Sequence, residues 1–149
     1  MSVLLALLAA AVVVLPAQPP ARGGTKLGRP RWVEIGKTGN DNPIRVDARS
    51  LRTAPDGITH AVVHVRLLTP GKSPKGPVTS SKTVVMLDCA RKSVAIPEHW
   101  YYLDEKAGKI YQHTFTDRPG YGPALGGSMT FVVMEKLCAP GAVERYRKG

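Results

Sequence analysis

The clearest alternation of apolar and polar positions in the chain lies between residues 58 and 68. One set of alternate positions holds Ala61, Val63, Val65 and Leu67, and the other holds His60, Val62, His64 and Arg66. A period of two is that of a strand, in which successive side chains point to opposite faces. The segment therefore predicts a strand with one apolar face and one basic, solvated face.

The two histidines of this strand are four residues apart, as in a helical metal pair, but H-A-V-V-H lacks the glutamate of H-E-x-x-H. On a strand, residues four apart are separated by about 13 Å, so His60 and His64 cannot hold one ion together. The favoured interpretation is a solvated face. The alternatives are contact with an anion and a site shared between strands.

Shorter segments predict further strands and the turns between them. The strands are expected at residues 32–35, 43–47, 80–89 with its buried apolar run 84–87, 90–96, 100–103 and 109–115. Residues 39–42 and 104–108 have the composition of turns, and 47–51 resembles one capped helical turn. Residues 69–79, with three prolines, predict a long loop.

A helical period appears only near the end of the chain, from about residue 128 to 138. Its positions are Leu125, Met129, Val132, Val133, Lys136 and Leu137. Ser128 is a suitable N-cap, and Pro140 and Gly141 stand just past the end. The basic residues 144–149 are expected to fray. Together the patterns predict an α+β fold, a single antiparallel β-sheet of about six strands with a C-terminal helix packed on one face.

Residues 3–15 form an uncharged apolar run, about the length of a signal-peptide core and shorter than the roughly 18–20 residues that span a bilayer. The run predicts export to the periplasm, the cell surface or the medium, with cleavage after Ala17 or Ala21; a retained anchor is the alternative. The expected organisation is a signal peptide at 1–21, a basic Pro/Gly-rich linker at 22–31, a folded domain at 32–139 and a basic tail at 140–149.

The chain has two cysteines, Cys89 and Cys138. In an oxidising compartment they would pair, whereas in the cytosol they would be two buried thiols. A bond between them would tether the last helix to the middle of the sheet and close a loop of about 50 residues. There is no C-x-x-C sequence, which disfavours a redox role.

An excess of basic residues, 21 against 11 acidic ones, gives the chain a net charge of +10. Such a charge attracts acidic partners, among them nucleic acid, anionic lipid, acidic polysaccharide and acidic proteins. Nucleic acid is not expected, because of the export signal and because basic and aromatic residues are hardly interleaved in sequence. The candidate partner-binding residues are Arg66, Lys72, Lys75, Arg91 and Lys92.

No catalytic, cofactor or metal constellation is found. Asp104 and Glu105 are adjacent, so they are interpreted as turn carboxylates rather than as an acid/base pair. Residues 126–130 have Thr130 in place of the last glycine of G-x-S-x-G. The sequence therefore predicts no enzyme and no cofactor. A site on the His60 and His64 face is the enzymatic alternative.

A set of motifs over residues 32–139 resembles the surface-adhesin protein E-like domain of Gram-negative bacteria. They are a leading tryptophan strand, V-D-A-x-S-L (Val46, Asp47, Ala48, Ser50 and Leu51), a long hydrophobic strand, D-C (Asp88 and Cys89) followed by basic residues, and a late helix ending in cysteine. The resemblance implies an antiparallel sheet with the helix tethered to it by a disulfide. It also implies no enzymatic activity, in a family whose namesakes are outer-membrane lipoproteins that bind host matrix and serum proteins.

The expected function is therefore an exported, non-enzymatic binding module. Its partner is expected to be an acidic polysaccharide or a host matrix or serum protein. The alternative is a periplasmic structural or envelope-associated protein that makes peripheral contact with anionic envelope polymers.

Overall fold

All the strands in the described part of the chain, residues 28–149 of the computed structural model, belong to one antiparallel sheet. The strands are β1 Trp32–Lys37, β2 Pro43–Asp47, β3 Arg52–Thr53, β4 Thr59–Gly71, β5 Val78–Asp88, β6 Ser93–Asp104, β7 Lys109–Phe115 and β8 Gly122–Pro123. Two helices follow, α1 Met129–Leu137 and α2 Ala142–Lys148. The predicted signal peptide and residues 22–27 of the predicted linker lie outside the described residues.

The single antiparallel sheet and the helix packed on it were both predicted, but the sheet has eight strands rather than about six. Six of them follow one another in the order β1-β2-β4-β5-β6-β7. The other two, β3 and β8, are two residues long and pair with β4 and β6. Two residues are too few to show any period, so sequence patterning could not find them.

The β4–β5 hairpin is longer than predicted, because β4 continues to Gly71 and β5 begins at Val78. The expected loop at 69–79 is thereby reduced to residues 72–77. Pro70 is tolerated in β4 because it lies between Arg66 and Gly71, where the register of the ladder shifts.

The β5–β6 connection is also a hairpin turn, where an extended segment was predicted from residue 90. Asp88 pairs with Ser93, which leaves only residues 89–92 for the turn. The Asp88 carboxylate accepts a hydrogen bond from the Arg91 backbone N–H, and Lys92 takes a positive φ of 53°. An aspartate that bonds its own turn explains the reversal.

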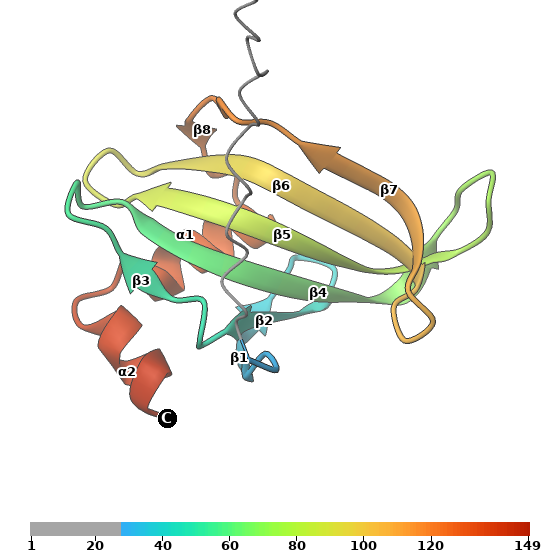
Figure 1. Cartoon of the computed structure of the whole chain (residues 1–149), viewed down its shortest axis with the longest axis horizontal. Coiled ribbons are helices and arrows are strands. Elements are labelled where there is room, and N and C mark those ends of the chain that lie inside the picture. Colours follow the sequence, from blue (N-terminus) through green and yellow to red (C-terminus); the bar gives the residue numbers. More distant parts are fainter. Residues whose placement is uncertain (1–27) are drawn as a thin grey trace, which may run out of the picture.

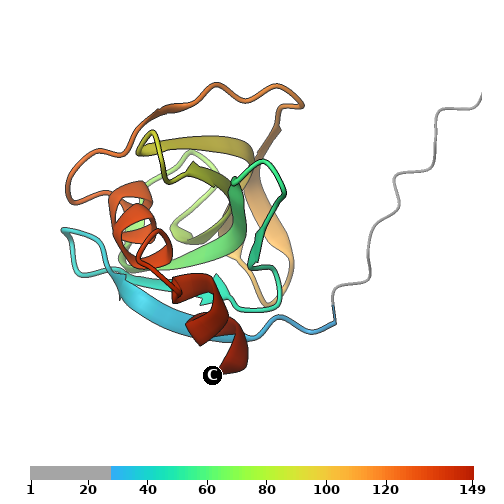
Figure 2. The same ribbon diagram turned by 90° about the vertical axis from the view of Figure 1, so that its left-hand side faces the viewer.

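The core lies between the concave side of the sheet and α1 (Figure 2). Val133, Met134 and Leu137 of the helix are buried against the sheet. The sheet residues of this core are Ile35, Ile44, Val46, Ala61, Val63, Val65, Val85, Leu87 and Val94. The helix has the predicted N-cap, since the Ser128 hydroxyl accepts a hydrogen bond from the Phe131 N–H.

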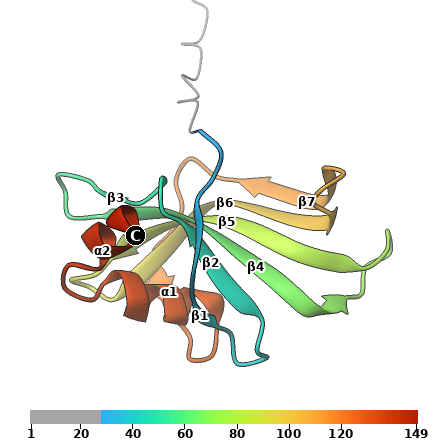
Figure 3. The ribbon, with the colours of Figure 1, turned by 90° about the horizontal axis from the view of Figure 1, so that it is seen from below.

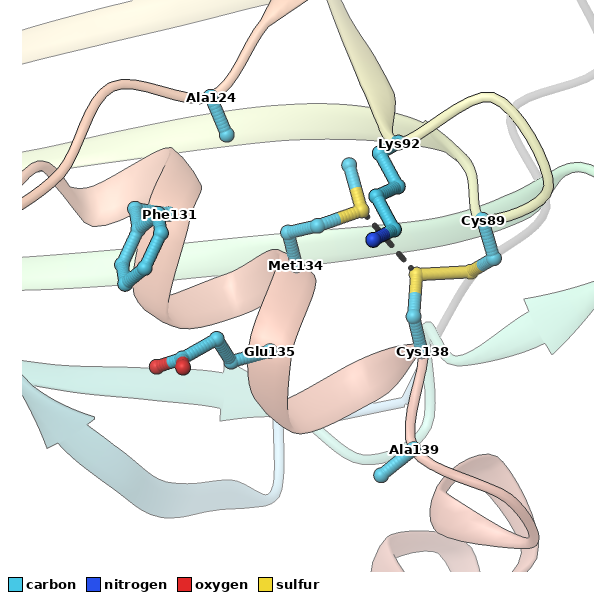
Figure 4. A pocket seen from close by; sticks show the side chains of 8 residues that line it. All are labelled: Cys89, Lys92, Ala124, Phe131, Met134, Glu135, Cys138 and Ala139. Carbon is cyan, nitrogen blue, oxygen red and sulfur yellow. Dashed lines mark hydrogen bonds between the residues drawn. A yellow bond between two sulfur atoms is a disulfide. The ribbon is translucent and has the colours of Figure 1, made fainter.

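The predicted disulfide joins Cys89, immediately after β5, to Cys138, the C-cap of α1 (Figure 4). It links residues 49 apart in sequence and holds the end of the helix at the end of a central strand. The Cys138 Sγ lies 3.2 Å from the Met134 Sδ. Because a disulfide sulfur carries no proton, this is a close contact between sulfurs.

The basic tail was predicted to fray, but residues 142–148 form α2. Ala142 is buried, and Val143 and Tyr146 pack against the core. The Arg31 guanidinium donates to the backbone carbonyls of Tyr146 and Arg147, which would otherwise lack partners at the helix C-terminus. The last residue of the predicted linker therefore stabilises the tail. No described helix has the length and apolar character needed to cross a membrane.

Candidate functional site

One face of the sheet is covered by α1, and the opposite face is the candidate site. β4 alternates as predicted, with Ala61, Val63 and Val65 buried on the core side. Both described helices pack on that side, because Val143 and Tyr146 of α2 also contact the core (Figure 3). Figure 1 looks on to the opposite side, with α1 behind the strands. We call this side the open face.

Strand pairing lines up aromatic and basic side chains on the open face. Directly paired residues of antiparallel strands share a face. The register places in one row Arg45, His64, Lys82, Trp100 and His113, from β2, β4, β5, β6 and β7. The next row contains Arg66, Ser80 and Tyr102. Basic and aromatic residues are thus interleaved in space, although they are hardly interleaved in sequence.

Ring contacts hold this array together. The Trp32 and His64 ring centroids are 5.4 Å apart, and Trp100 stacks on His113 at 4.9 Å with an interplanar angle of 3°. The Lys82 ammonium lies 5.9 Å from the Trp32 ring centroid and 5.4 Å from that of Tyr102. Both distances are within the range of cation–π attraction. The rings therefore have fixed positions on an accessible face.

Glu105, in the β6–β7 turn, reaches across the sheet to two other strands. Its carboxylate oxygens lie 2.7 Å from the His64 Nε2, 2.9 Å from the Ser80 Oγ and 2.7 Å from the Lys82 Nζ. Burial raises the pKa of the Glu105 carboxyl, but the hydrogen bonds from Lys82, His64 and Ser80 outweigh it and hold the pKa below its usual range. Glu105 is therefore ionised at neutral pH and is already paired.

Beside Glu105 the open face is hollowed over a volume of about 610 Å³. The hollow is lined by Trp32, Arg45, His64, Arg66, Thr79, Ser80, Asp104, Glu105 and Lys106. No ion pair engages Arg45, Arg66 or Lys106 among residues 28–149. Glu105 is neutralised by its own partners, and Asp104 is the other carboxylate of the lining, opposed by three basic side chains; the hollow therefore has a net positive charge. One of its walls is the Trp32 ring.

The five sequence-predicted basic residues do not form one cluster. Arg66 lines the hollow, and Lys72 and Lys75 lie in the β4–β5 turn at the same end of the sheet. Arg91 and Lys92 lie in the β5–β6 turn at the opposite end (Figure 1). β5 has 11 residues, so the two ends are about 35 Å apart.

The residues at the far end have other surroundings. The Arg91 guanidinium is 3.7 Å from the Asp88 carboxylate. Lys92 lines a separate pocket of about 500 Å³ beside the disulfide, together with Phe131, Met134 and Glu135 (Figure 4). Any site that uses Arg66, Lys72 and Lys75 is therefore distinct from one that uses Arg91 and Lys92.

Sequence reasoning missed Trp32, Arg45, Lys82 and Glu105. Glu105 was interpreted only as a turn carboxylate, which it is, but its side chain also contacts β4 and β5. Strand alternation gives the face on which each residue lies, but not which residues lie opposite one another. His64 of β4 contacts Glu105 of the β6–β7 turn, so its imidazole is paired rather than simply solvated; a site shared between strands stays a prediction.

Among the described residues there is no group of three or more His, Cys, Asp or Glu side chains that could hold a metal ion.

No family model and no curated protein matches the chain. Solved structures of Haemophilus influenzae protein E are similar to it. One, a second crystal form, has a TM-score of 0.49 and 15% identity over 87% of this chain and 97% of that one.

A further structure, of protein E from non-typeable Haemophilus influenzae, has a TM-score of 0.47 and 17% identity over 89% of this chain and 87% of that one. The chain resembles protein E in fold. This is the protein after which the family suggested by the sequence motifs is named.

Replacing Glu105 by glutamine is expected to make the stability of the protein less dependent on acid pH. Because the folded pKa of Glu105 lies below its usual value of 4.5, the carboxylate stabilises the fold above that pH. The contribution is lost as the pH falls through the folded pKa. Urea unfolding between pH 7 and pH 3 should show a lower free energy of unfolding for Glu105→Gln at pH 7 and a shallower decline below 4.5. Glu135→Gln, at an exposed position of α1, is the matched control, and equal profiles for the two variants would contradict the expectation.

Proposed function

We propose that this chain is an exported, non-enzymatic binding module whose open face holds an acidic polysaccharide. The observation that carries the proposal is the row of fixed aromatic rings and basic side chains on a sheet face that neither described helix covers. Tryptophan and tyrosine rings offer broad apolar surfaces to sugar rings, and arginine and lysine pair with carboxylates and sulfates. The net charge of +10 adds long-range attraction for such a polymer.

Several features support export to the periplasm or the cell surface. The apolar run at 3–15 has the character of a signal peptide, and the disulfide fits an oxidising compartment. A surface location would make host-derived polysaccharides the partners. A periplasmic location would favour the envelope-associated alternative, in which anionic envelope polymers occupy the same face. Protease digestion of the protein on intact cells, compared with cells whose outer membrane has been opened, separates the two locations.

Heparin chromatography of two double variants tests whether binding uses one end of the sheet. Lys72→Gln/Lys75→Gln removes two charges in the β4–β5 turn, at the end of the sheet that carries the hollow, and Arg91→Gln/Lys92→Gln removes two charges at the opposite end. At about 0.5 kcal/mol for each exposed charge pair, the first variant should bind about fivefold more weakly and elute at lower salt. The second should elute close to the wild type.

The equal charge of the two variants makes them controls for each other. Retention unchanged in both would refute a polyanion-binding function for these residues. Equal loss in both would show attraction by net charge alone, which is what the envelope-associated alternative predicts.

A further inference from the structure

The hollow beside Glu105 is lined by two arginines, Arg45 and Arg66, and by the Trp32 ring. We propose that Arg45 and Arg66 together bind a single sulfate or carboxylate there, with the sugar ring against Trp32. This inference rests on the proposed polysaccharide-binding function. It adds where on the open face one acidic sugar unit binds and which groups hold it.

Arg45 and Arg66 are placed to converge on one anion. Arg45 of β2 pairs directly with His64 of β4, and Arg66 is two residues further along β4 on the same face. Such diagonal neighbours are about 7–8 Å apart at the backbone, within reach of two long side chains. Each guanidinium presents a planar fork of N–H donors that matches the oxygens of a carboxylate or sulfate. Two forks from adjacent strands can therefore hold one oxyanion.

The neighbouring carboxylates do not satisfy these two arginines. Both oxygens of Glu105 are engaged by His64, Ser80 and Lys82. The Asp104 carboxylate accepts a hydrogen bond from the Ala107 N–H within its own turn. Glu34 pairs with Arg45 in the β1–β2 register, but their charged groups form no ion pair. An incoming anion therefore displaces no ion pair of either arginine.

The walls of the hollow indicate a sugar rather than a free inorganic ion. Trp32 supplies an aromatic wall whose position is held by His64 and Lys82. The volume of about 610 Å³ is within the usual range for small-ligand sites and exceeds what one sulfate would fill. The Thr79 and Ser80 side chains and the Lys106 ammonium provide further polar groups at the edge. A ring with hydroxyls and one acidic substituent matches these walls.

Binding of a short oligosaccharide distinguishes this subsite from the general electrostatic attraction of a long polyanion. A fully sulfated heparin tetrasaccharide and an unsulfated glucuronate-containing tetrasaccharide are titrated into the full chain by calorimetry, in parallel with heparin chromatography. For the tetrasaccharide that binds, Arg45→Gln/Arg66→Gln should weaken affinity by about 30-fold, from the loss of charge-assisted hydrogen bonds. Lys72→Gln/Lys75→Gln, which removes the same charge outside the hollow, should weaken it by less than about threefold. Arg45→Lys/Arg66→Lys should give an intermediate loss, because lysine keeps the charge but not the fork.

Tryptophan fluorescence places the ligand within the fold. The chain has two tryptophans, so Trp32→Phe should remove the part of the fluorescence change that arises in the hollow, and Trp100→Phe should keep that part. Arg45 and Arg66 are exposed, and unchanged circular dichroism and melting of their variants would verify folding.

Binding of the sulfated or the uronate ligand identifies which oxyanion is held. The subsite is overturned if neither tetrasaccharide binds, or if Lys72→Gln/Lys75→Gln weakens binding as much as Arg45→Gln/Arg66→Gln does. Heparin retention that persists in either case would leave the proposed function standing without this subsite. Loss of retention by the wild-type chain itself would reject both.

Discussion

Removing the disulfide is expected to lower the free energy of unfolding by about 4 kcal/mol. Cys89 and Cys138 are 49 residues apart, and a crosslink that closes a loop of this length removes about that much chain entropy from the unfolded state. The native state is affected too. α1 has only nine residues, too few for a helix that is stable by itself, and the bond holds its C-terminal end against β5.

Urea unfolding of Cys89→Ser/Cys138→Ser against the wild type measures this loss, and hydrogen exchange locates it. Amide protection should fall first in α1 and α2, which lie directly before and after Cys138 in the chain. Wild-type protein unfolded in reductant is the matched control, because it lacks the bond but keeps both side chains. A decrease below about 1 kcal/mol would mean that packing alone positions the helix and that the crosslink is dispensable.

Local signals made much of this fold predictable from sequence. The bounds of α1 follow from a 3.6-residue period, the Ser128 cap and the glycine and proline that come after it. The faces of β4 follow from its strict alternation, and the pairing of the cysteines follows from the predicted export to an oxidising compartment. Each of these signals lies within a few residues or depends on the compartment, so no knowledge of tertiary contacts was needed.

The candidate site was less predictable, because it depends on register. Arg45, His64, Lys82 and Trp100 lie on four different strands, and only the pairing of those strands puts them in one row. The sequence selected Arg66 from the basic face of a strand and the other four basic residues from loops or turns. That criterion found Lys72 and Lys75 near the hollow, but it also grouped them with Arg91 and Lys92 at the other end. The missing information was which residues lie opposite one another, which no single segment contains.

The ion pairs of Glu105 could not be predicted from its own segment either. In sequence it is one of two adjacent acidic residues in a turn between strands. In the fold its carboxylate is paired with Lys82 and His64, so it forms no ion pair with the three basic side chains that line the hollow, Arg45, Arg66 and Lys106. Glu105 therefore lines the hollow without making it negative, because its charge is already paired with Lys82.

Replacing Leu87 by alanine is expected to cost about 3 kcal/mol of unfolding free energy. Leu87 is fully buried, at 0% exposure, in the central strand β5, where it pairs with Thr59 and Val94 and belongs to the core beneath α1. Truncation removes buried methyl groups and leaves a cavity that the close-packed sheet and helix can only partly fill. Because domains of this size are stable by about 5–15 kcal/mol, the loss is large.

Leu68→Ala is the matched control, since the same atoms are removed from a side chain that is 58% exposed, and its effect should be within about 0.5 kcal/mol. Urea unfolding of both variants compares them, and similar losses would contradict the assigned core. Leu87 and Lys82 lie on opposite faces of β5, because they are five positions apart and successive strand residues alternate between faces. Leu87→Ala should therefore lower stability while the folded protein still elutes from heparin at the wild-type salt concentration. Arg45→Gln/Arg66→Gln should do the reverse, which would show that the two faces of one sheet carry stability and binding separately.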